Sequence, residues 1–295
     1  MTLIIIALAL VCERLLTEFR RWREYNWLGV YLERLQDIGW LAPLWRSAWG
    51  LLLILPVLGG VLLLQILLQG GLLTVAGLVF SFVMLVFSLG PRDLWEEVHS
   101  YIAAVEQGDT VTADRLAADL CAAGGRRPDS ARGRSVVNAV VIQGNERLFG
   151  VLLWFFVLGP MGAVLYRLAA EWPAELRKMQ ASEGLVDIAM RLHGLVAWIP
   201  IRVSALLYGL AGDTDGALTG WRTAAARPSQ SWFQQGWQCL AGAGGGALTP
   251  DYDDDHPRFE QSVAATLSEA LSLVTRSLVI LLGALAAFTI GGWIA

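Results

Sequence analysis

The sequence predicts an all-α integral membrane protein with about five membrane segments, an amphipathic interfacial helix and a cytoplasmic helical hairpin. Its 295 residues are 55% hydrophobic and only 16% charged, whereas about a quarter of the residues in an ordinary soluble domain are charged. No charged side chain occurs between Arg46 and Arg92, and the mean hydropathy of the chain is +0.52. Backbone within a bilayer must satisfy its own hydrogen bonds, so we expect these apolar stretches to be helices.

Two membrane helices are predicted in the charge-free interval, because a helix needs about 20 residues to cross a bilayer. We place them at 47–68 and 72–89, as a transmembrane hairpin over residues 47–89. Gln69, Gly70 and Gly71 stand between them, and glycine tolerates the backbone conformations of a tight reversal. Both outer ends of the hairpin are therefore expected on one side of the membrane.

Further membrane segments are predicted before and after this hairpin. Residues 1–11 are apolar but lack the basic start and the cleavage site of a signal peptide, so we interpret them as a retained segment. The runs 148–166 and 277–295 contain no charge, whereas 189–210 is interrupted by polar residues that should face protein or water. We assign core membrane segments to 147–211 and a C-terminal transmembrane helix to 275–295.

The distribution of basic residues predicts the topology. Most arginines lie in 14–46, 91–147 and 212–276, while 171–188 contains only Arg177 and Lys178. Basic residues favour the cytoplasmic side. We therefore expect the first three of these segments in the cytoplasm and both chain termini outside.

Three polar regions separate the membrane segments. Residues 14–45 alternate arginine with aromatic and aliphatic side chains at helical spacing, as in an interfacial helix. In the region 91–146 we expect a helical hairpin, with helices at 93–106 and 112–122 and a turn at Gly108-Asp109. This hairpin has a plain alternative interpretation, which is a scaffold without chemistry. The region 212–274 is expected to be a polar loop, because it is rich in glycine at 242–246 and acidic at 251–255.

Several classes of function are disfavoured by what the sequence lacks. Lys178 is the sole lysine and no GxxxxGK[ST] motif occurs, which excludes a P-loop. A net charge of -4 does not suggest a nucleic-acid partner. The three cysteines and three histidines show no metal-ligand spacing, so no metal site is predicted. The acidic run at 251–256 lacks the glycine and terminal glutamate of a calcium loop and is interpreted as a solvated turn.

Polar side chains at the edges of the membrane segments are the candidates for a functional site. Asn145, Glu146 and Arg147 precede one apolar run, and Arg167 closes it. Arg191, His193 and Arg202 follow on the next apolar segment. Arg191 and Arg202 are eleven residues apart, about three helical turns, so both point to one face and could bind a phosphate or carboxylate. The alternative is that each arginine pairs with a carboxylate such as Glu13, Glu146 or Asp187.

A family resemblance is carried by motifs spread over most of the chain. The motifs are Glu13-Arg14-Leu15, Arg92 with His99 and Tyr101, Gly108-Asp109, Asn145-Glu146-Arg147-Leu148-Phe149, Leu153-Trp154-Phe155, Gly159-Pro160-Met161-Gly162-Ala163 with Tyr166-Arg167, and Trp198-Ile199-Pro200-Ile201-Arg202. In their order and spacing the chain resembles AmpE, a bacterial inner-membrane protein family associated with β-lactamase regulation. It is more distantly similar to the CobD/CbiB group of membrane enzymes that make adenosylcobinamide phosphate.

The resemblance implies two alternative functions. Similarity to AmpE implies a multi-pass inner-membrane modulator linked to β-lactamase induction and cell-wall sensing. Similarity to the synthases implies an enzyme related to amide-forming ligases, which use a nucleoside triphosphate and magnesium, acting on an anionic substrate at the cytoplasmic face. Those enzymes have a Glu-Asn-Thr-Ser-Asp-Gly stretch where this chain has Gln143 to Leu148, so two carboxylates are replaced by Gln143 and Arg147. Where the synthases have a histidine, this chain has Arg227 in Arg227-Pro228-Ser229.

The two functions assign different roles to the same residues. For the enzyme we expect Glu146 as general base and Arg167, Arg191 and Arg202 as anion clamps around one cavity. For a modulator, these side chains hold the helices together or bind a ligand. The complete ligand-binding prediction is His99, Asn145, Arg147, Arg167, Arg191, His193 and Arg202. The lipid bilayer and an anionic small molecule are the predicted partners, and the sequence predicts neither a cofactor nor an oligomeric state.

Overall fold

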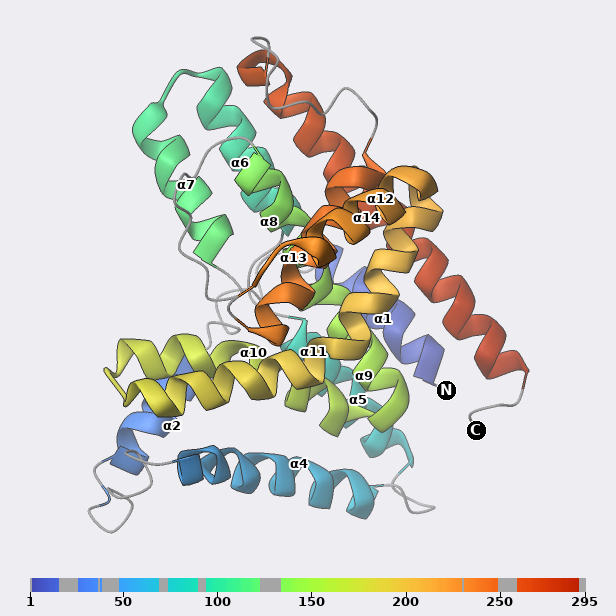
Figure 1. Cartoon of the computed structure of the whole chain (residues 1–295). Helices are drawn as coiled ribbons and strands as arrows, with labels where there is room; N and C mark the ends of the chain where they lie inside the picture. The colour runs from blue at the N-terminus through green and yellow to red at the C-terminus, as the bar shows by residue number, and fades with distance from the viewer. Residues whose placement is uncertain are drawn as a thin grey trace. The chain divides into compact units, whose positions relative to one another are not determined.

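Helices form the architecture in the computed structural model, which describes residues 2–15, 26–36, 38, 48–68, 74–89, 94–122, 134–229, 231–248 and 259–291. No strand occurs in these ranges, which confirms the all-α class. The chain divides into two units, residues Met1–Pro91 with Gly150–Ala197 and residues Arg92–Phe149 with Trp198–Ala295. Figure 1 shows the helices of both units with their labels.

Unit 1 consists of the N-terminal helices and a later helical hairpin. Its elements are α1 (Thr2–Leu15), α2 (Asn26–Gln36), the 3-10 helix η3 (Ala48–Ile54), α4 (Leu55–Leu68), α5 (Thr74–Ser88), α9 (Gly150–Leu158), α10 (Pro160–Lys178) and the first part of α11 (Glu183–Ala211). Leu168, Trp172 and Leu176 of α10 are buried together with Leu185 and Ala189 of α11. The spacing of four residues places each set on one helix face, and α10 and α11 lie side by side (Figure 1).

Unit 2 contains the remaining helices. They are α6 (Leu94–Glu106), α7 (Thr110–Ala122), α8 (Arg134–Gly144), the π-helical turn η6 (Asn145–Phe149), the second part of α11, α12 (Thr214–Ala226), α13 (Trp232–Ala247) and α14 (Phe259–Ile290). Helix α8 packs against α7, α13 and α14, and α12 packs against α13. Two hydrogen bonds join α11 to its neighbours. Tyr208 Oη donates to the carbonyl oxygen of Val141 in α8 at 2.7 Å, and Ser277 Oγ of α14 donates to the carbonyl oxygen of Leu207 at 3.3 Å.

Three described helical stretches are long and apolar enough to cross a membrane, namely 134–158, 183–211 and 263–290. These stretches support the prediction that the chain is a membrane protein. The predicted number of about five membrane segments stays a prediction. Helices α4 and α5 of the predicted hairpin contain only 14 and 15 residues, and its turn at 69–71 lies outside the described residues. Of the predicted interfacial segment 14–45, the described residues include the helix Asn26–Gln36.

The charge-free run 148–166 is not one continuous helix, which corrects its interpretation as a single membrane segment. The first helix ends at Leu158, and α10 begins at Pro160. Gly159 lies between them with φ of +67°, a conformation that L side chains rarely adopt. The proline has no N–H to donate and disfavours the helical conformation in the preceding residue, so the chain turns here.

The hairpin predicted within 91–146 has its two helices where the sequence places them. Leu94, Val98 and Tyr101 bury one face of α6, and Gly108 has φ of +71° in the turn. Asp109 then caps α7, since its carboxylate accepts hydrogen bonds from Thr112 N at 3.1 Å and from Thr112 Oγ1 at 2.5 Å. These hydrogen bonds hold the pKa of Asp109 below its usual value. The remaining residues of this region that are described form α8 and the start of η6.

Helices, rather than a polar loop, form most of the region 212–274. Helices α12, α13 and the first half of α14 occupy it, and the acidic run 251–255 lies outside the described residues. The glycine run at 242–246 is helical, and two of its glycines, Gly242 and Gly246, face α12. A Cβ on Gly216 would collide with the Gly246 carbonyl oxygen, and a Cβ on Gly220 with that of Gly242. Two glycines four residues apart on each helix allow close backbone contact, as in membrane helix pairs.

A methyl group at this contact should therefore destabilise unit 2. We expect Gly220→Ala to cost about 1–3 kcal/mol, because the neighbouring backbone has to move. Gly283→Ala on α14 is the matched control, since a Cβ there meets no atom within 4 Å. Thermal unfolding of the detergent-purified protein measures both. Equal melting temperatures for the two variants would contradict the close packing of α12 and α13.

Candidate ligand-binding site

The motif Asn145–Phe149 forms the π-helical turn that follows α8. Asn145 is fully buried, and Glu146 is 4% exposed. The Ser204 hydroxyl of α11 donates a hydrogen bond of 2.9 Å to Asn145 Oδ1. Phe149 packs edge to face against Tyr208, with ring centroids 5.7 Å apart. Single π turns inside helices are frequent at functional sites, but here the first two side chains are enclosed by the protein.

Arg147 is held by side chains of unit 2. Its guanidinium lies 2.8 Å from a carboxylate oxygen of Glu97, and its Nε donates to Gln143 Oε1 at 2.5 Å. The Gln143 amide donates in turn to the carbonyl oxygen of Leu120 at 2.9 Å. This network joins α6, α7 and α8. The predicted ligand-binding residue Arg147 thus cross-links three helices.

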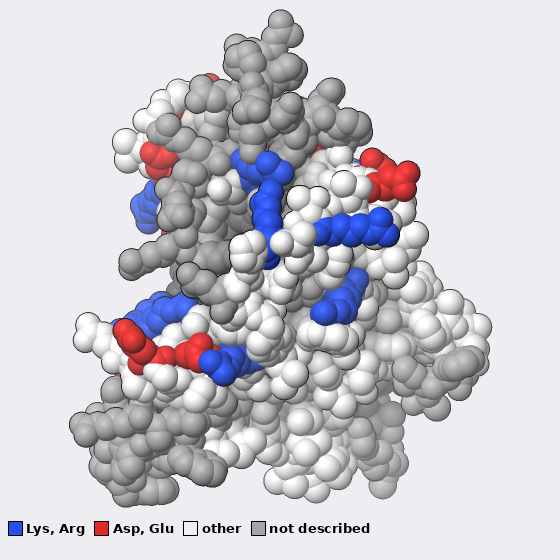
Figure 2. All heavy atoms as spheres, in the orientation of Figure 1, with Lys and Arg blue, Asp and Glu red and all other residues white. Residues whose placement is uncertain are grey.

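Three residues of the predicted ligand-binding set, Arg167, Arg191 and His193, lie in unit 1. Arg167 pairs with Glu171 at 2.6 Å, and Arg191 pairs with Asp187 at 2.9 Å, each within one helical turn. His193 is buried, and its ring lies edge to face against Tyr166 with centroids 6.2 Å apart. Figure 2 shows basic and acidic side chains next to each other over the hairpin of α10 and α11. These ion pairs agree with the alternative in which arginines are neutralised by neighbouring carboxylates.

His99 and Arg202 complete the predicted set, and both are exposed in unit 2. His99 Nδ1 lies 2.6 Å from the carbonyl oxygen of Trp95 on its own helix. Arg202 Nη1 donates to the carbonyl oxygen of Trp198 at 2.9 Å, and its guanidinium lies 3.7 Å from the centre of the Trp198 ring. Glu146 lines neither of the two cavities described below. The convergence of Arg191, Glu146 and Arg202 on one cavity stays a prediction.

A polar cavity of about 670 Å³ lies within unit 2. Helix α8 contributes Arg134 and Asn138, and α13 contributes Gln238. The other polar residues that line it are Asp213, Thr219, Thr223 and Arg227, on or beside α12. The lining contains two arginines and one aspartate, so its formal charge is positive by one. Its volume is within the range of small-molecule sites.

Gln238 lines this polar cavity and has an amide oxygen without a partner in the described chain. Its Oε1 atom is buried and, among the described residues, has no hydrogen-bond partner. Buried polar atoms without a partner are rare, because each costs free energy. An anionic ligand suits the two arginines that line this cavity.

Arg134, Asn138 and Gln238 were not among the site residues predicted from the sequence. They belong to no recognised sequence motif. They come together because α8 and α12 both pack against α13. Two signals were present, namely the Arg227-Pro228-Ser229 stretch and the glycines at 242–246. Gly242, Gly245 and Gly246 line the cavity.

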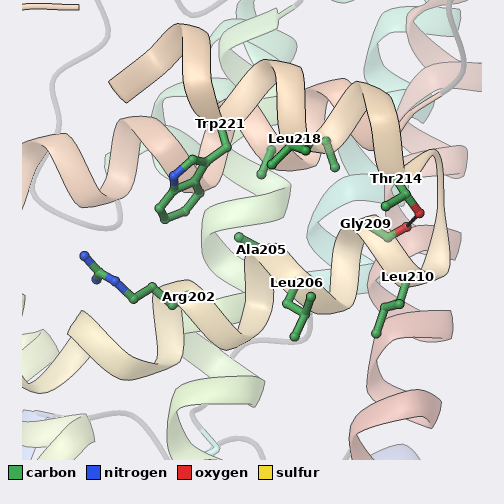
Figure 3. A pocket seen from close by; sticks show the side chains of 10 residues that line it. Arg202, Ala205, Leu206, Gly209, Leu210, Thr214, Leu218 and Trp221 are labelled. Carbon is green, nitrogen blue, oxygen red and sulfur yellow. Dashed lines mark hydrogen bonds between the residues drawn. The ribbon is translucent and has the colours of Figure 1, made fainter. Parts of the chain in front are cut away.

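A second, apolar cavity of about 280 Å³ lies between α11 and α12. Leu206, Leu210 and Leu218 are among the residues that line it. Figure 3 shows Arg202 and Trp221 at one end of this cavity and Thr214 and Gly209 at the other. Of the described residues that line it, Arg202 is the single charged one. In the described chain, no group of three or more histidine, cysteine or acidic side chains could hold a metal ion.

The helical fold, with its long apolar helices and its polar cavity, is that of an α-helical membrane protein. Residues 1–292 match the family model described as regulatory signalling modulator protein AmpE. The chain belongs to this family, which confirms the resemblance predicted from its motifs.

Two curated proteins, both described as cobalamin biosynthesis protein CobD, are also similar to the chain. The protein of Chromobacterium violaceum is 28% identical over 257 residues, which cover 82% of this chain and 78% of that protein. The protein of Stutzerimonas stutzeri is 31% identical over 244 residues, covering 81% of this chain and 78% of that protein. This similarity confirms the distant relationship. No solved structure matches the chain.

The ion pair of Arg147 and Glu97 should contribute to stability. Their side chains are only 13% and 17% exposed, and removing one partner of a buried pair costs roughly 3 kcal/mol. We expect Glu97→Gln to lower the melting temperature of the purified protein clearly. Asp187→Asn breaks the pair with Arg191, whose side chains are 62% and 41% exposed, and should cost less than about 1 kcal/mol. Equal effects of the two substitutions would contradict a structural role for Arg147.

Proposed function

We propose that this protein is a bacterial inner-membrane modulator that binds a small anionic cell-wall fragment in the polar cavity of unit 2 and thereby influences β-lactamase induction. The observation that carries this proposal is the cavity itself, with two arginines and a buried amide oxygen in its lining. Membership of the family described as regulatory signalling modulators supports the regulatory role. The long apolar helices support a multi-pass arrangement in the membrane.

The chemistry of the cavity agrees with a cell-wall fragment as ligand. Muropeptides carry carboxylates, which guanidinium groups bind with paired hydrogen bonds. Their amide N–H and hydroxyl groups can donate to Gln238 Oε1 and to the hydroxyl oxygens of Thr219 and Thr223. By contrast, Arg147, Arg167 and Arg191 are occupied by carboxylates of the protein. Arg227, which lines the cavity, is therefore the stronger candidate for binding an anion.

Replacing the cavity arginines should weaken ligand binding without unfolding the protein. We expect muropeptides to raise the melting temperature of the detergent-purified wild-type protein, because a ligand at 100 times its Kd stabilises the folded state by about 2.7 kcal/mol. Arg134→Gln and Arg227→Gln should reduce this rise, since each removes a positive charge from the cavity. Arg222→Gln is the matched control on α12, because Arg222 is exposed and lines neither cavity.

The regulatory role is tested by β-lactamase induction in cells that lack the protein and are complemented with each variant. We expect Arg134→Gln and Arg227→Gln to change induction, while Arg222→Gln restores the wild-type level. Membrane abundance of each variant is measured in parallel. Normal induction by the two cavity variants would contradict the proposal.

A second candidate function is a membrane enzyme that acts on an anionic substrate at the cytoplasmic face. One observation favours it, which is similarity over four-fifths of the chain to proteins described as cobalamin biosynthesis protein CobD. In this case Glu146 is the general base, and Arg167, Arg191 and Arg202 bind the substrate. The burial of Glu146 and the ion pairs of two of these arginines do not favour it.

The same melting experiment separates the two functions. Stabilisation by magnesium nucleotide together with a corrinoid or a phosphorylated amino-alcohol, lost in Arg202→Ala, would favour the enzyme. Stabilisation by muropeptides alone would favour the modulator. Absence of stabilisation by all of these compounds would contradict both.

A further inference from the structure

The polar cavity of unit 2 runs along the whole length of α12. Asp213, Gly216, Gly220, Thr223 and Arg227 all line it, and their spacing of three or four residues places them on one helix face. The first of these residues is the N-cap of α12 and the last is its C-cap. They are fourteen residues apart, which corresponds to a helical rise of about 21 Å. The cavity is therefore elongated, and its two ends lie at the two ends of one helix.

The residues at the two ends of the polar cavity carry opposite charges. Asp213 is held at the start of α12, because its carboxylate accepts a hydrogen bond from the backbone N–H of Asp215 at 3.0 Å. Within the part of the chain that the structure describes, neither Asp213 nor Arg227 has an ion-pair partner. A ligand that fills the cavity can therefore place a cationic group at one end and an anionic group at the other.

Between these ends, the polar cavity is lined by groups that suit a peptide main chain. Asn138, Thr219 and Thr223 line it, and their amide and hydroxyl groups can each donate and accept hydrogen bonds. Peptide bonds offer both an N–H donor and a carbonyl acceptor. Glycines of the run at 242–246 form another part of the lining. Because glycine has no side chain, a ligand main chain can lie close to the backbone there.

We propose that the polar cavity binds a free peptide of about five or six residues in an extended conformation, with its terminal amine at Asp213 and its terminal carboxylate at Arg227. An extended chain spans at most about 3.3–3.6 Å per residue, so about six residues cover the length of α12. A guanidinium binds a carboxylate with two parallel hydrogen bonds. A fragment without a cationic group would leave Asp213 without a counter-ion.

This assignment rests on the proposed function and narrows its ligand. The cell-wall fragment is then the peptide itself, with its amino end released from the sugar. A peptide that is joined to the sugar has an uncharged amide in place of this amine. It can still present its carboxylates to the arginines, but it has no terminal amine for Asp213. The charge of the amine therefore distinguishes the two forms of the ligand.

Calorimetric titration of the detergent-purified full-length protein tests this assignment. The probes are the free five-residue peptide of the cell wall, the same peptide with its terminal amine acetylated, and the same peptide joined to its muramyl sugar. We expect the free peptide to bind with a Kd about fivefold lower than those of the other two probes. A factor of this size is the upper range for one exposed ion pair.

Three variants locate the charge that is recognised. Asp213→Asn should remove the preference for the free peptide, because asparagine also caps a helix but has no charge. Asp215→Asn is the matched control, since Asp215 is exposed and lines neither cavity of unit 2, and it should keep the preference. Arg227→Gln should weaken all three probes by a similar factor and keep the preference, because sites more than about 10 Å apart act independently.

Melting temperatures close to that of the wild type show that each variant is folded. Asp213→Ser, which also provides a cap, replaces Asp213→Asn if the latter fails this check. Equal binding of the free and acetylated peptides by the wild type would overturn the assignment and leave an anionic fragment as the ligand. A preference that persists in Asp213→Asn, or that Asp215→Asn also removes, would overturn it as well. Absence of binding by all three probes would contradict the proposed function itself.

Discussion

Close backbone contact between α12 and α13 is the constraint on which both cavities of unit 2 depend. Gly216 and Gly220 face Gly246 and Gly242, and any side chain at these positions would collide with a carbonyl group. The backbone N–H of Asp213 also donates to the Ala247 carbonyl oxygen at 2.9 Å. Because α12 is held this closely, one of its faces lines the polar cavity and another lines the apolar one.

The distribution of charge partners separates structural arginines from candidates for binding. Arg147, Arg167 and Arg191 each pair with a carboxylate from the same unit. The pair of Arg147 with Glu97 joins different helices and is mostly buried, so breaking it is costly. The pairs of Arg167 and Arg191 each lie within one helix. Arg202, in contrast, has an aromatic partner and an open apolar groove. An arginine motif in a membrane segment therefore indicates a function only after its neighbours are known.

Local signals predicted part of the fold well. The helices α6 and α7 were expected on either side of the turn at Gly108-Asp109, where Gly108 has a positive φ and Asp109 caps α7. The glycines at 242–246 were expected in a loop, but they lie in α13, where Gly242 and Gly246 face α12 and Gly244 faces Val141 of α8. The run 148–166 was expected to be one segment, although Gly159-Pro160 indicates the break. Spacing of glycines at four residues was the signal that could have predicted α12 and α13.

The sequence by itself determined the helical class, the membrane character and the family, since these depend on composition, periodicity and the order of local motifs. Asn145, Glu146 and Arg147 were candidate site residues from the sequence; the structure places them in a π-helical turn, and their role in a site stays a prediction. Only the tertiary structure decided which polar residues form a cavity. Arg134, Asn138, Arg227 and Gln238 are up to about a hundred residues apart, and they line one cavity because glycine contacts and buried hydrogen bonds bring their helices together.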